Sequence, residues 1–151
     1  GMLVQSGNDA TFALIEKASG DLPTFVARMN ATATQLGLTH SHFANATGLN
    51  NPRHYSSARD LTRLAIAIKR DYPEYVAWFA LKEYRWADIV QSNRNPLLRY
   101  PGVDGLKTGH TENAGYCLVA SAERDGMRLI ATLLGAESEQ ERRRGGRKSS
   151  L

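Results

Sequence analysis

Two short polar stretches of the sequence combine residue types that can carry out chemistry. Residues 6–8 read Ser-Gly-Asn directly before a predicted helix, and residues 107–109 read Lys-Thr-Gly in a β-type segment. A lysine can bind an anion, and a serine hydroxyl and an asparagine amide can form hydrogen bonds to a substrate. Taken alone, each tripeptide is weak, because Ser-x-Asn is common where a loop enters a helix and a lone edge-strand lysine is usually a surface residue. The fold must bring the two stretches together before this chemistry can operate.

The first half of the chain is predicted to be helical. Apolar residues recur at helical spacing in three segments, 8–19, 21–37 and 57–71. Asn8 and Asp9 are expected to cap the first helix, Asp21 the second, and a Ser57-x-x-Asp60 capping box the third. Between the last two helices, residues 37–56 are rich in Gly, Asn, Pro, Ser and Thr, which predicts an ordered loop.

The second half of the chain is predicted to form an antiparallel meander. Residues 102–110, 115–126 and 127–135 are short β-type runs, and the sequence Arg-Asp-Gly before Met127 is a tight-turn signal. A last helix is expected over residues 137–144, ending before the glycine pair at 145–146. The fold class is therefore α/β, of the α+β type: a helical lobe followed by antiparallel strands and a terminal helix.

Composition divides the chain into a body and a basic end. The formal net charge is +4, but residues 142–151 contribute +5 and hold no acid, so the remainder carries −1. We expect one domain over residues 1–141 and a flexible basic tail over 142–151, and we do not expect nucleic-acid binding. The single cysteine, Cys117, cannot form an intrachain disulfide. No apolar run approaches the ~18 residues of a membrane span.

Other candidate residues have simpler interpretations. His40-x-His42 lacks further ligands at recognisable spacing, so we expect neither a metal nor a cofactor. Arg94 and Arg99 could steer an anionic substrate or bind backbone carbonyl groups. Six aromatic residues of the middle segment are expected to pack in the core and between the lobes: Tyr72, Tyr75, Trp78, Phe79, Tyr84 and Trp86.

Longer stretches resemble the catalytic domain of serine D-alanyl-D-alanine carboxypeptidases. These stretches are LVQSGNDA, FVARMNATATQLGLTHSHFANATGL, YSSARDLTRLA, SNRNPLL and VDGLKTGHTENAGYCLVASAERDGMRLIA, and they follow in order over residues 3–138. The resemblance implies a β-lactamase / D,D-peptidase-like fold and a bacterial, periplasmic or otherwise extracytoplasmic enzyme of peptidoglycan maturation. Such an enzyme removes the terminal D-alanine of a peptidoglycan stem peptide and is acylated by β-lactams. A β-lactamase is an alternative, but YSSARD and NRN resemble the carboxypeptidases more.

The resemblance also assigns roles to the two motifs. A D-Ala-D-Ala stem ends in a carboxylate and docks as an extended strand, so Lys107 would bind the anion and Gly109 would leave room for the approaching backbone. Thr108 could add a hydroxyl hydrogen bond to the carboxylate, although adjacent strand residues point to opposite faces unless a bulge or twist intervenes. The backbone N–H of His110 would hold the oxyanion. The resemblance implies that Ser6 relays a proton to the leaving amine and contacts Lys107, whose charge would stabilise the deprotonated hydroxyl. It also implies that the Asn8 amide binds the peptide carbonyl of the substrate.

The nucleophile motif of the family is not found in these 151 residues. Members of this family carry the acyl-accepting serine in a Ser-x-x-Lys motif, and no lysine of these 151 residues has a serine three positions earlier. We therefore expect a domain that is incomplete at its N-terminus, inactive on its own and prone to self-association, from a parent that could be membrane-anchored. A catalytically inactive muropeptide-binding or regulatory module and a basic-tailed interaction protein remain alternative functions.

Overall fold

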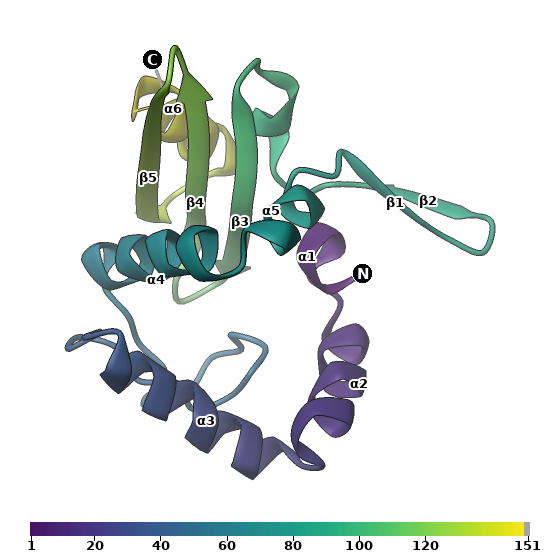
Figure 1. Cartoon of the computed structure of the whole chain (residues 1–151), viewed down its shortest axis with the longest axis vertical. Coiled ribbons are helices and arrows are strands. Elements are labelled where there is room, and N and C mark those ends of the chain that lie inside the picture. The colour runs from purple at the N-terminus through teal and green to yellow at the C-terminus, as the bar shows by residue number, and fades with distance from the viewer. Residues whose placement is uncertain (150–151) are drawn as a thin grey trace.

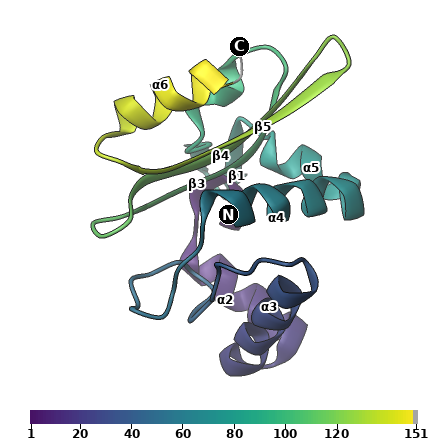
Figure 2. The ribbon, with the colours of Figure 1, turned by 90° about the vertical axis from the view of Figure 1, so that its left-hand side faces the viewer.

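The computed structural model describes residues 1–149, and the side chains of residues 1–146. A three-stranded sheet forms the middle layer of the larger lobe, with helices on both of its faces (Figures 1 and 2). Helices of the N-terminal part and a long loop form a second lobe beside it. No helix among the described residues is long and apolar enough to cross a membrane.

The helices of the first half lie close to where the periodicity predicts them. They are α2 (Asn8–Ser19), α3 (Leu22–Gln35) and α4 (Ala58–Asp71). Asp21 caps α3 by accepting a 2.8 Å hydrogen bond from the Thr24 N–H, and Ser57 caps α4 by accepting one of 3.2 Å from Asp60. The expected cap of α2 is wrong: Gly7 is its N-cap, without a side-chain hydrogen bond, and Asn8 is already its first helical residue.

The long loop between α3 and α4 is ordered around one buried acid. Asp60, which is fully buried, accepts hydrogen bonds of 2.8 Å from the His40 backbone N–H and from the Ser41 hydroxyl. Across the loop, His42 and Tyr55 form an isolated antiparallel bridge. These contacts fasten the second lobe to the start of α4.

The predicted meander is present, with the strands β3 (Val103–Thr111), β4 (Gly115–Arg124) and β5 (Met127–Ala136) in the order β3-β4-β5. Asp125 and Gly126 both have positive φ, of 50° and 75°, as the tight turn between β4 and β5 requires. The β3–β4 register shifts between Val103 and Gly105, so Asp104 is an extra residue in a β-bulge. Both β3 and β5 are edge strands within the described sheet.

Alternate residues of the meander face two different helical layers. Leu118 and Ala120 of β4 pack with Leu97 in a buried cluster on the face covered by α6 (Glu139–Ser149). On the opposite face, Thr132 of β5 shares a 2.7 Å hydroxyl hydrogen bond with Thr62 of α4. We call these two sides of the sheet the α6 face and the α4 face.

The terminal helix corrects the prediction of a flexible tail. Helix α6 runs through the glycine pair to Ser149, and Arg142 within it is 5% exposed. A Cβ at Gly146 would lie 2.7 Å from side-chain atoms of both Leu97 and Leu118, so the glycine allows α6 to approach the core closely. Packing against the sheet outweighs the low helix propensity of glycine. Residues 150–151 of the predicted tail lie outside the described residues.

Four elements were not predicted from the sequence. They are α1 (Met2–Gln5), α5 (Pro73–Phe79), and the hairpin of β1 (Glu83–Trp86) and β2 (Ile89–Ser92), which projects from the body (Figure 1). A 3₁₀ turn, η1 (Pro96–Arg99), follows the hairpin. The prediction that the aromatic residues of this segment are core is wrong for several of them: Trp86 is 71% exposed and Tyr72, Tyr75 and Trp78 are also exposed.

Candidate active site

The serine of the first motif lies at a sharp turn between two helices. Ser6 is the C-cap of α1, with a left-handed backbone (φ 57°, ψ 39°), and Gly7 is the N-cap of α2. Arg94 holds this turn through two hydrogen bonds: its backbone N–H donates to the Val4 carbonyl at 3.1 Å, and its guanidinium donates to the Gln5 carbonyl at 2.9 Å. The exposed Ser6 hydroxyl is therefore presented from a fixed turn.

Lys107 of β3 reaches this serine from the sheet. Its ammonium donates one hydrogen bond to Ser6 Oγ and a second, of 2.8 Å, to the carbonyl oxygen of Thr108. Lys107 pairs with Val119, which also pairs with Thr132, so all three lie on the α4 face. The structure thus brings together the hydroxyl and the cation that the sequence places about a hundred residues apart.

The site is electrostatically suited to an anion. Burial, followed by the positive charges of Arg94 and Arg142, lowers the pKa of Lys107 to about 8. Within the described part of the chain, Lys107 forms no ion pair with a carboxylate. An arriving carboxylate would offset this charge and raise the pKa of Lys107 again.

Two further motif residues, Asn8 and Gly109, could contact a substrate. Asn8 offers its side-chain amide, and Gly109 leaves space beside β3. The Asn8 side chain is exposed and makes no hydrogen bond to the residues described here. A Cβ at Gly109 would lie 3.8 Å from Cys117 Cβ, which is an ordinary contact, and the Gly109 backbone has no positive φ. At Gly102, by contrast, φ is 80° and a Cβ would lie 2.4 Å from the Glu123 carbonyl oxygen. A side chain at position 102 would therefore overlap the backbone, whereas a Cβ at position 109 would fit within this chain.

Thr108 and His110 lie next to the site but do not take part in the Lys107–Ser6 contact. Thr108 is buried and pairs with Leu118, which places its side chain on the α6 face, opposite to Lys107. The bulge precedes this pair of residues and leaves their alternation intact, so a Thr108 contact with substrate stays a prediction. The His110 ring packs against Tyr116 with centroids 4.0 Å apart, and the oxyanion role of its backbone N–H also stays a prediction.

Beyond His110, an open hollow of about 340 Å³ lies at the β3–β4 turn and the end of β5. Its lining includes Tyr116 and Glu137 but none of Ser6, Asn8 or Lys107. The hollow is therefore not part of the proton-relay contact.

The other candidates from the sequence have local partners. Arg94 binds a backbone carbonyl, one of its two expected roles, while Arg99 donates to the Tyr100 hydroxyl at 3.2 Å and lies 5.0 Å from that ring. His40 contacts the Thr39 hydroxyl at 3.0 Å. In the region that the structure describes, His, Cys, Asp and Glu side chains form no group of three or more that could hold a metal ion.

Arg142 contributes to the site, although the sequence predicts it both in the last helix and in the basic tail. Its guanidinium lies 5.5 Å from the centre of the Tyr116 ring, and its charge acts on Lys107. The start of the helix is held by two hydrogen bonds: Ser138 accepts one of 3.1 Å from the Glu141 N–H, and Glu141 accepts one of 2.8 Å from the Glu137 N–H. The helical prediction was therefore the correct one for Arg142, and its effect on Lys107 was not predicted.

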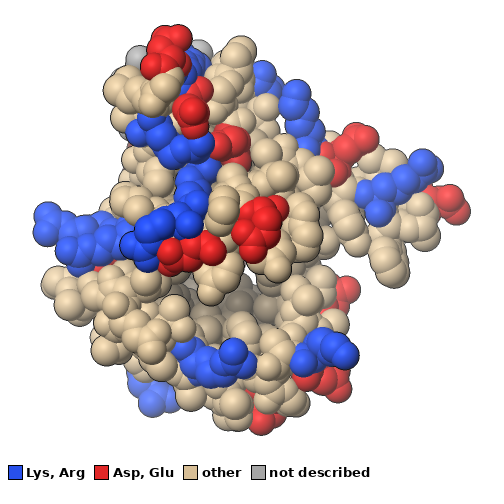
Figure 3. Space-filling view, in the orientation of Figure 1, with Lys and Arg blue, Asp and Glu red and all other residues tan. Residues whose placement is uncertain are grey.

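Figure 3 shows one face of the molecule, on which Lys and Arg side chains form a band over α4 and the sheet, with Asp and Glu side chains beside it.

Comparison with known proteins identifies a family. A family model described as D-alanyl-D-alanine carboxypeptidase matches residues 1–138. The D-alanyl-D-alanine carboxypeptidase DacA of Haemophilus influenzae is 47% identical over 138 residues, which cover 89% of this chain and 35% of that relative. The chain thus spans about a third of the length of this curated relative.

Solved structures share the fold. Penicillin-binding protein 5 from Haemophilus influenzae matches 98% of this chain with a TM-score of 0.94 and 44% identity, and 44% of that protein is covered. Penicillin-binding protein D2 from Listeria monocytogenes, in its ampicillin-bound form, matches 97% of the chain with a TM-score of 0.88 and 32% identity, and 62% of it is covered. These matches confirm the predicted fold class.

Proposed function

Since the chain belongs to the D-alanyl-D-alanine carboxypeptidase family, we propose that it forms the substrate-recognition and proton-relay half of a serine-type D-Ala-D-Ala carboxypeptidase site. The enzyme would release the terminal D-alanine of a peptidoglycan stem peptide through an acyl-enzyme. The family match favours this function over an inactive muropeptide-binding module. The nucleophile and its base, which the family carries as Ser-x-x-Lys, are not among these 151 residues.

The observation that carries the proposal is the Lys107–Ser6 hydrogen bond at an exposed strand edge. A hydroxyl held by a cation can accept a proton and pass it on, because the cation stabilises the alkoxide character that develops during transfer. Ser6 would deliver that proton to the amine of the departing D-alanine. The side-chain amide of Asn8, which has no partner in the described chain, would bind the peptide carbonyl of the substrate.

Strand β3 would supply the docking surface. An extended peptide can add to an edge strand through main-chain hydrogen bonds, and a glycine in that strand permits close approach of the two backbones. Gly109 meets this requirement, and the positive charges of Lys107, Arg94 and Arg142 would attract the terminal carboxylate of the substrate. The Thr108 hydroxyl and the His110 N–H are proposed as additional donors.

The proposed substrate implies where in the cell the enzyme would act and which inhibitors would bind to it. Stem peptides belong to the bacterial cell wall, so the enzyme would act outside the cytoplasmic membrane. Ampicillin and cefotaxime are bound in structures of penicillin-binding protein D2. We therefore propose that β-lactams also occupy this site, with covalent attachment only where the Ser-x-x-Lys segment is present.

The proposal is tested by binding of an N-acylated D-Ala-D-Ala dipeptide to the 151-residue chain, followed by NMR. We expect shifts of the amide signals of Ser6, Asn8, Gly109 and His110. Affinity should fall about tenfold for the C-terminal amide of the same dipeptide and for Lys107→Ala, because each removes one half of a charge-assisted pair. Lys17→Ala, an exposed lysine on α2, is the matched control. Equal binding of acid and amide would refute the carboxylate role of Lys107.

A further inference from the structure

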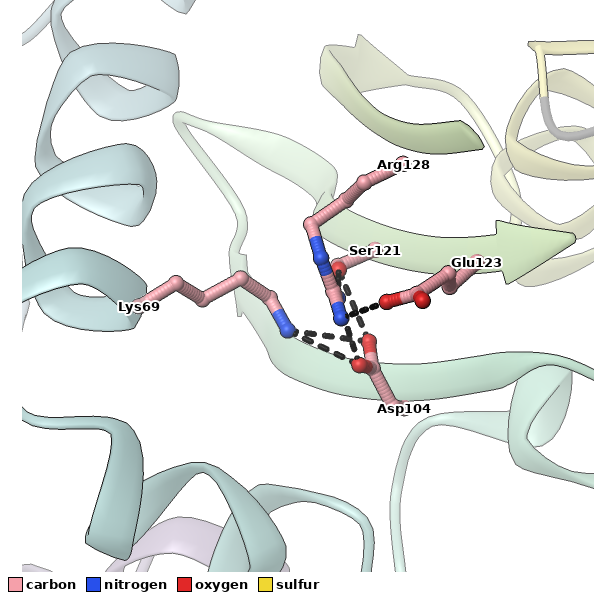
Figure 4. A network of polar contacts seen from close by, with 5 residues as sticks. All are labelled: Lys69, Asp104, Ser121, Glu123 and Arg128. Atoms are coloured by element: carbon pink, nitrogen blue, oxygen red, sulfur yellow. Dashed lines mark hydrogen bonds and ion pairs between the residues drawn. The ribbon is translucent and has the colours of Figure 1, made fainter. Parts of the chain in front are cut away.

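Asp104 is the centre of a polar network that joins four elements (Figure 4). Lys69 of α4 donates to both of its carboxylate oxygens at 3.0 Å, the Ser121 hydroxyl of β4 donates at 2.7 Å, and Arg128 of β5 donates at 2.6 Å. Arg128 also pairs with Glu123. The α4 helix and both neighbouring strands are thereby tied to a single residue of β3.

The network is partly buried: Lys69 and Ser121 lie on its inner side, while Arg128 and Glu123 are exposed. The side chain of Lys69 is only 9% exposed, and Ser121 is buried. Burial raises the pKa of Asp104, but hydrogen bonds from Arg128, Ser121 and Lys69 outweigh that effect and hold the pKa below its usual range. Asp104 is therefore a carboxylate that neutralises two cations in a partly buried site.

Asp104 is also the extra residue of the bulge, and this bulge decides which face Lys107 occupies. Val103 pairs with Ala122 on the α6 face, and an unbroken ladder from that pair would place Lys107 opposite Leu118, in the core beneath α6. With Asp104 inserted, Lys107 instead pairs with Val119 on the α4 face. A one-residue slip moves every side chain of a strand to the other face. Only the bulged register lets Lys107 reach Ser6.

We propose that Asp104 is a positioning residue for the Lys-Thr-Gly strand: its contacts with Lys69, Ser121 and Arg128 hold the bulge that turns Lys107 toward Ser6. The inference rests on the proposed role of Lys107 in the reaction. Asp104 itself touches neither Ser6 nor Lys107 among the contacts of the structure, so it acts through the register of β3.

Replacement of Asp104 by asparagine tests this role. The amide keeps the size of the side chain but removes the carboxylate that Lys69 and Arg128 share; Arg128 keeps its pair with Glu123, while the buried Lys69 loses its only ion-pair partner among the described residues, which favours release of the bulge. The matched control is Asp71→Asn, since Asp71 is an exposed acid on α4 whose ion pair is with its neighbour Arg70. It makes the same chemical change outside the network.

Two NMR measurements on the whole chain separate positioning from general stability. In the wild type we expect cross-strand NOEs between Lys107 and Val119 and a side-chain pKa of Lys107 near the value of about 8. In Asp104→Asn we expect NOEs from Lys107 to Leu118 and a change in the Lys107 pKa of at least about one pH unit. Asp71→Asn should leave both unchanged. A folded Asp104→Asn protein with wild-type NOEs and Lys107 pKa would overturn the proposal.

A second variant keeps the test decisive if Asp104→Asn does not fold. The double substitution Lys69→Met with Asp104→Asn removes the buried cation that would lose its partner, and the same two measurements are made on it. Wild-type NOEs and Lys107 pKa in the double variant would contradict positioning by Asp104, while an altered register would support it. Neither measurement needs a ligand, so this test can fail while the dipeptide-binding test of the proposed function succeeds, or the reverse.

Discussion

At the residue scale, the site carries an uncompensated cation. Lys107 is held beside two other positive charges with a pKa lowered to about 8, and among the described residues its hydrogen-bond acceptors, the Ser6 hydroxyl and the Thr108 carbonyl oxygen, are both neutral. A charge held in this way destabilises the folded, ligand-free protein. Its favourable electrostatic interaction forms only when an anion binds. Sites that bind or react commonly reduce stability in this way.

Replacing Lys107 with methionine should therefore stabilise the ligand-free chain while removing dipeptide binding. Near neutral pH we expect the melting temperature to rise by about 2–4 °C, because the buried charge is lost and most of the side-chain volume is kept. Calorimetry measures the change. A lower melting temperature would show that Lys107 holds the fold together, contrary to its proposed role.

The same residue predicts a pH dependence with a definite sign. The pKa of Lys107 is lower in the folded chain, about 8, than its ordinary value of 10.5. Between these values the unfolded chain binds more protons, so this group makes the folded state more stable as the pH rises from about 8 to 10.5. The free-energy difference between Lys107→Met and wild type should shrink over that range in urea titrations. A constant difference across it would contradict the lowered pKa.

Gly109 offers a test of docking that does not depend on charge. Its Cβ would meet only an ordinary contact within the chain, so Gly109→Ala should leave the melting temperature nearly unchanged yet weaken dipeptide binding about tenfold by obstructing the incoming backbone. Gly102→Ala should do the opposite and destabilise the fold, because its Cβ would overlap a carbonyl oxygen. Unchanged binding by Gly109→Ala would argue against strand addition at this position.

At the element scale, the features predicted correctly are those that depend on residues close together in the sequence. The Asp21 and Ser57 caps and the Asp125-Gly126 turn have short-range causes, and the corresponding elements lie where the sequence predicts them. The failures have long-range causes. Helix α6 passes through two glycines because they allow it to pack on Leu97 and Leu118, and no periodicity within the helix reveals that contact.

The site shows the same division between local and long-range causes. Its motif residues could be named from the sequence, and the resemblance to a family predicted that Ser6 contacts Lys107. The bulge at Asp104, which selects the face that Lys107 occupies, depends on partners in α4, β4 and β5. The effect of Arg142 on Lys107 was not predicted, because a run of basic residues is usually a solvated end.

The glycine pair in α6 predicts a contrast between two equivalent substitutions. Gly146→Ala should destabilise the chain by about 1–3 kcal/mol, because the new methyl group would overlap the buried Leu97 and Leu118. A Cβ at Gly145 would lie 2.8 Å from the end of the less buried Leu133 side chain, which can shift, and Gly145→Ala gains about 1 kcal/mol of helix propensity, so we expect a near-neutral effect. Urea denaturation measures both. Equal effects would mean that α6 does not pack on the core as described.

At the scale of the whole molecule, unpaired strand edges predict self-association. Both β3 and β5 lie at edges of the described sheet, and residues 129–136 of β5 contain neither a charge nor a proline. An uncharged edge strand of this length is a surface on which another chain can pair.

Light scattering should show concentration-dependent association that Leu134→Lys reduces, because a charge on the edge opposes pairing. Phe12→Ser, which removes an exposed apolar side chain from α2, is the control for association through the second lobe. A monomer at every concentration would contradict the prediction. Association that responds only to Phe12→Ser would assign the contact to α2.

The central claim is that the chain holds the recognition and relay residues of a D-Ala-D-Ala carboxypeptidase but not its nucleophile. Mass spectrometry after incubation with penicillin tests it most directly. The 151-residue chain should show no acyl adduct. The same chain, preceded by an upstream segment that carries a Ser-x-x-Lys motif of this family, should carry one adduct on the serine of that motif, and Lys107→Ala should slow its formation at least about tenfold. A stoichiometric adduct on the 151-residue chain, at Ser6 or any other serine, would contradict the account.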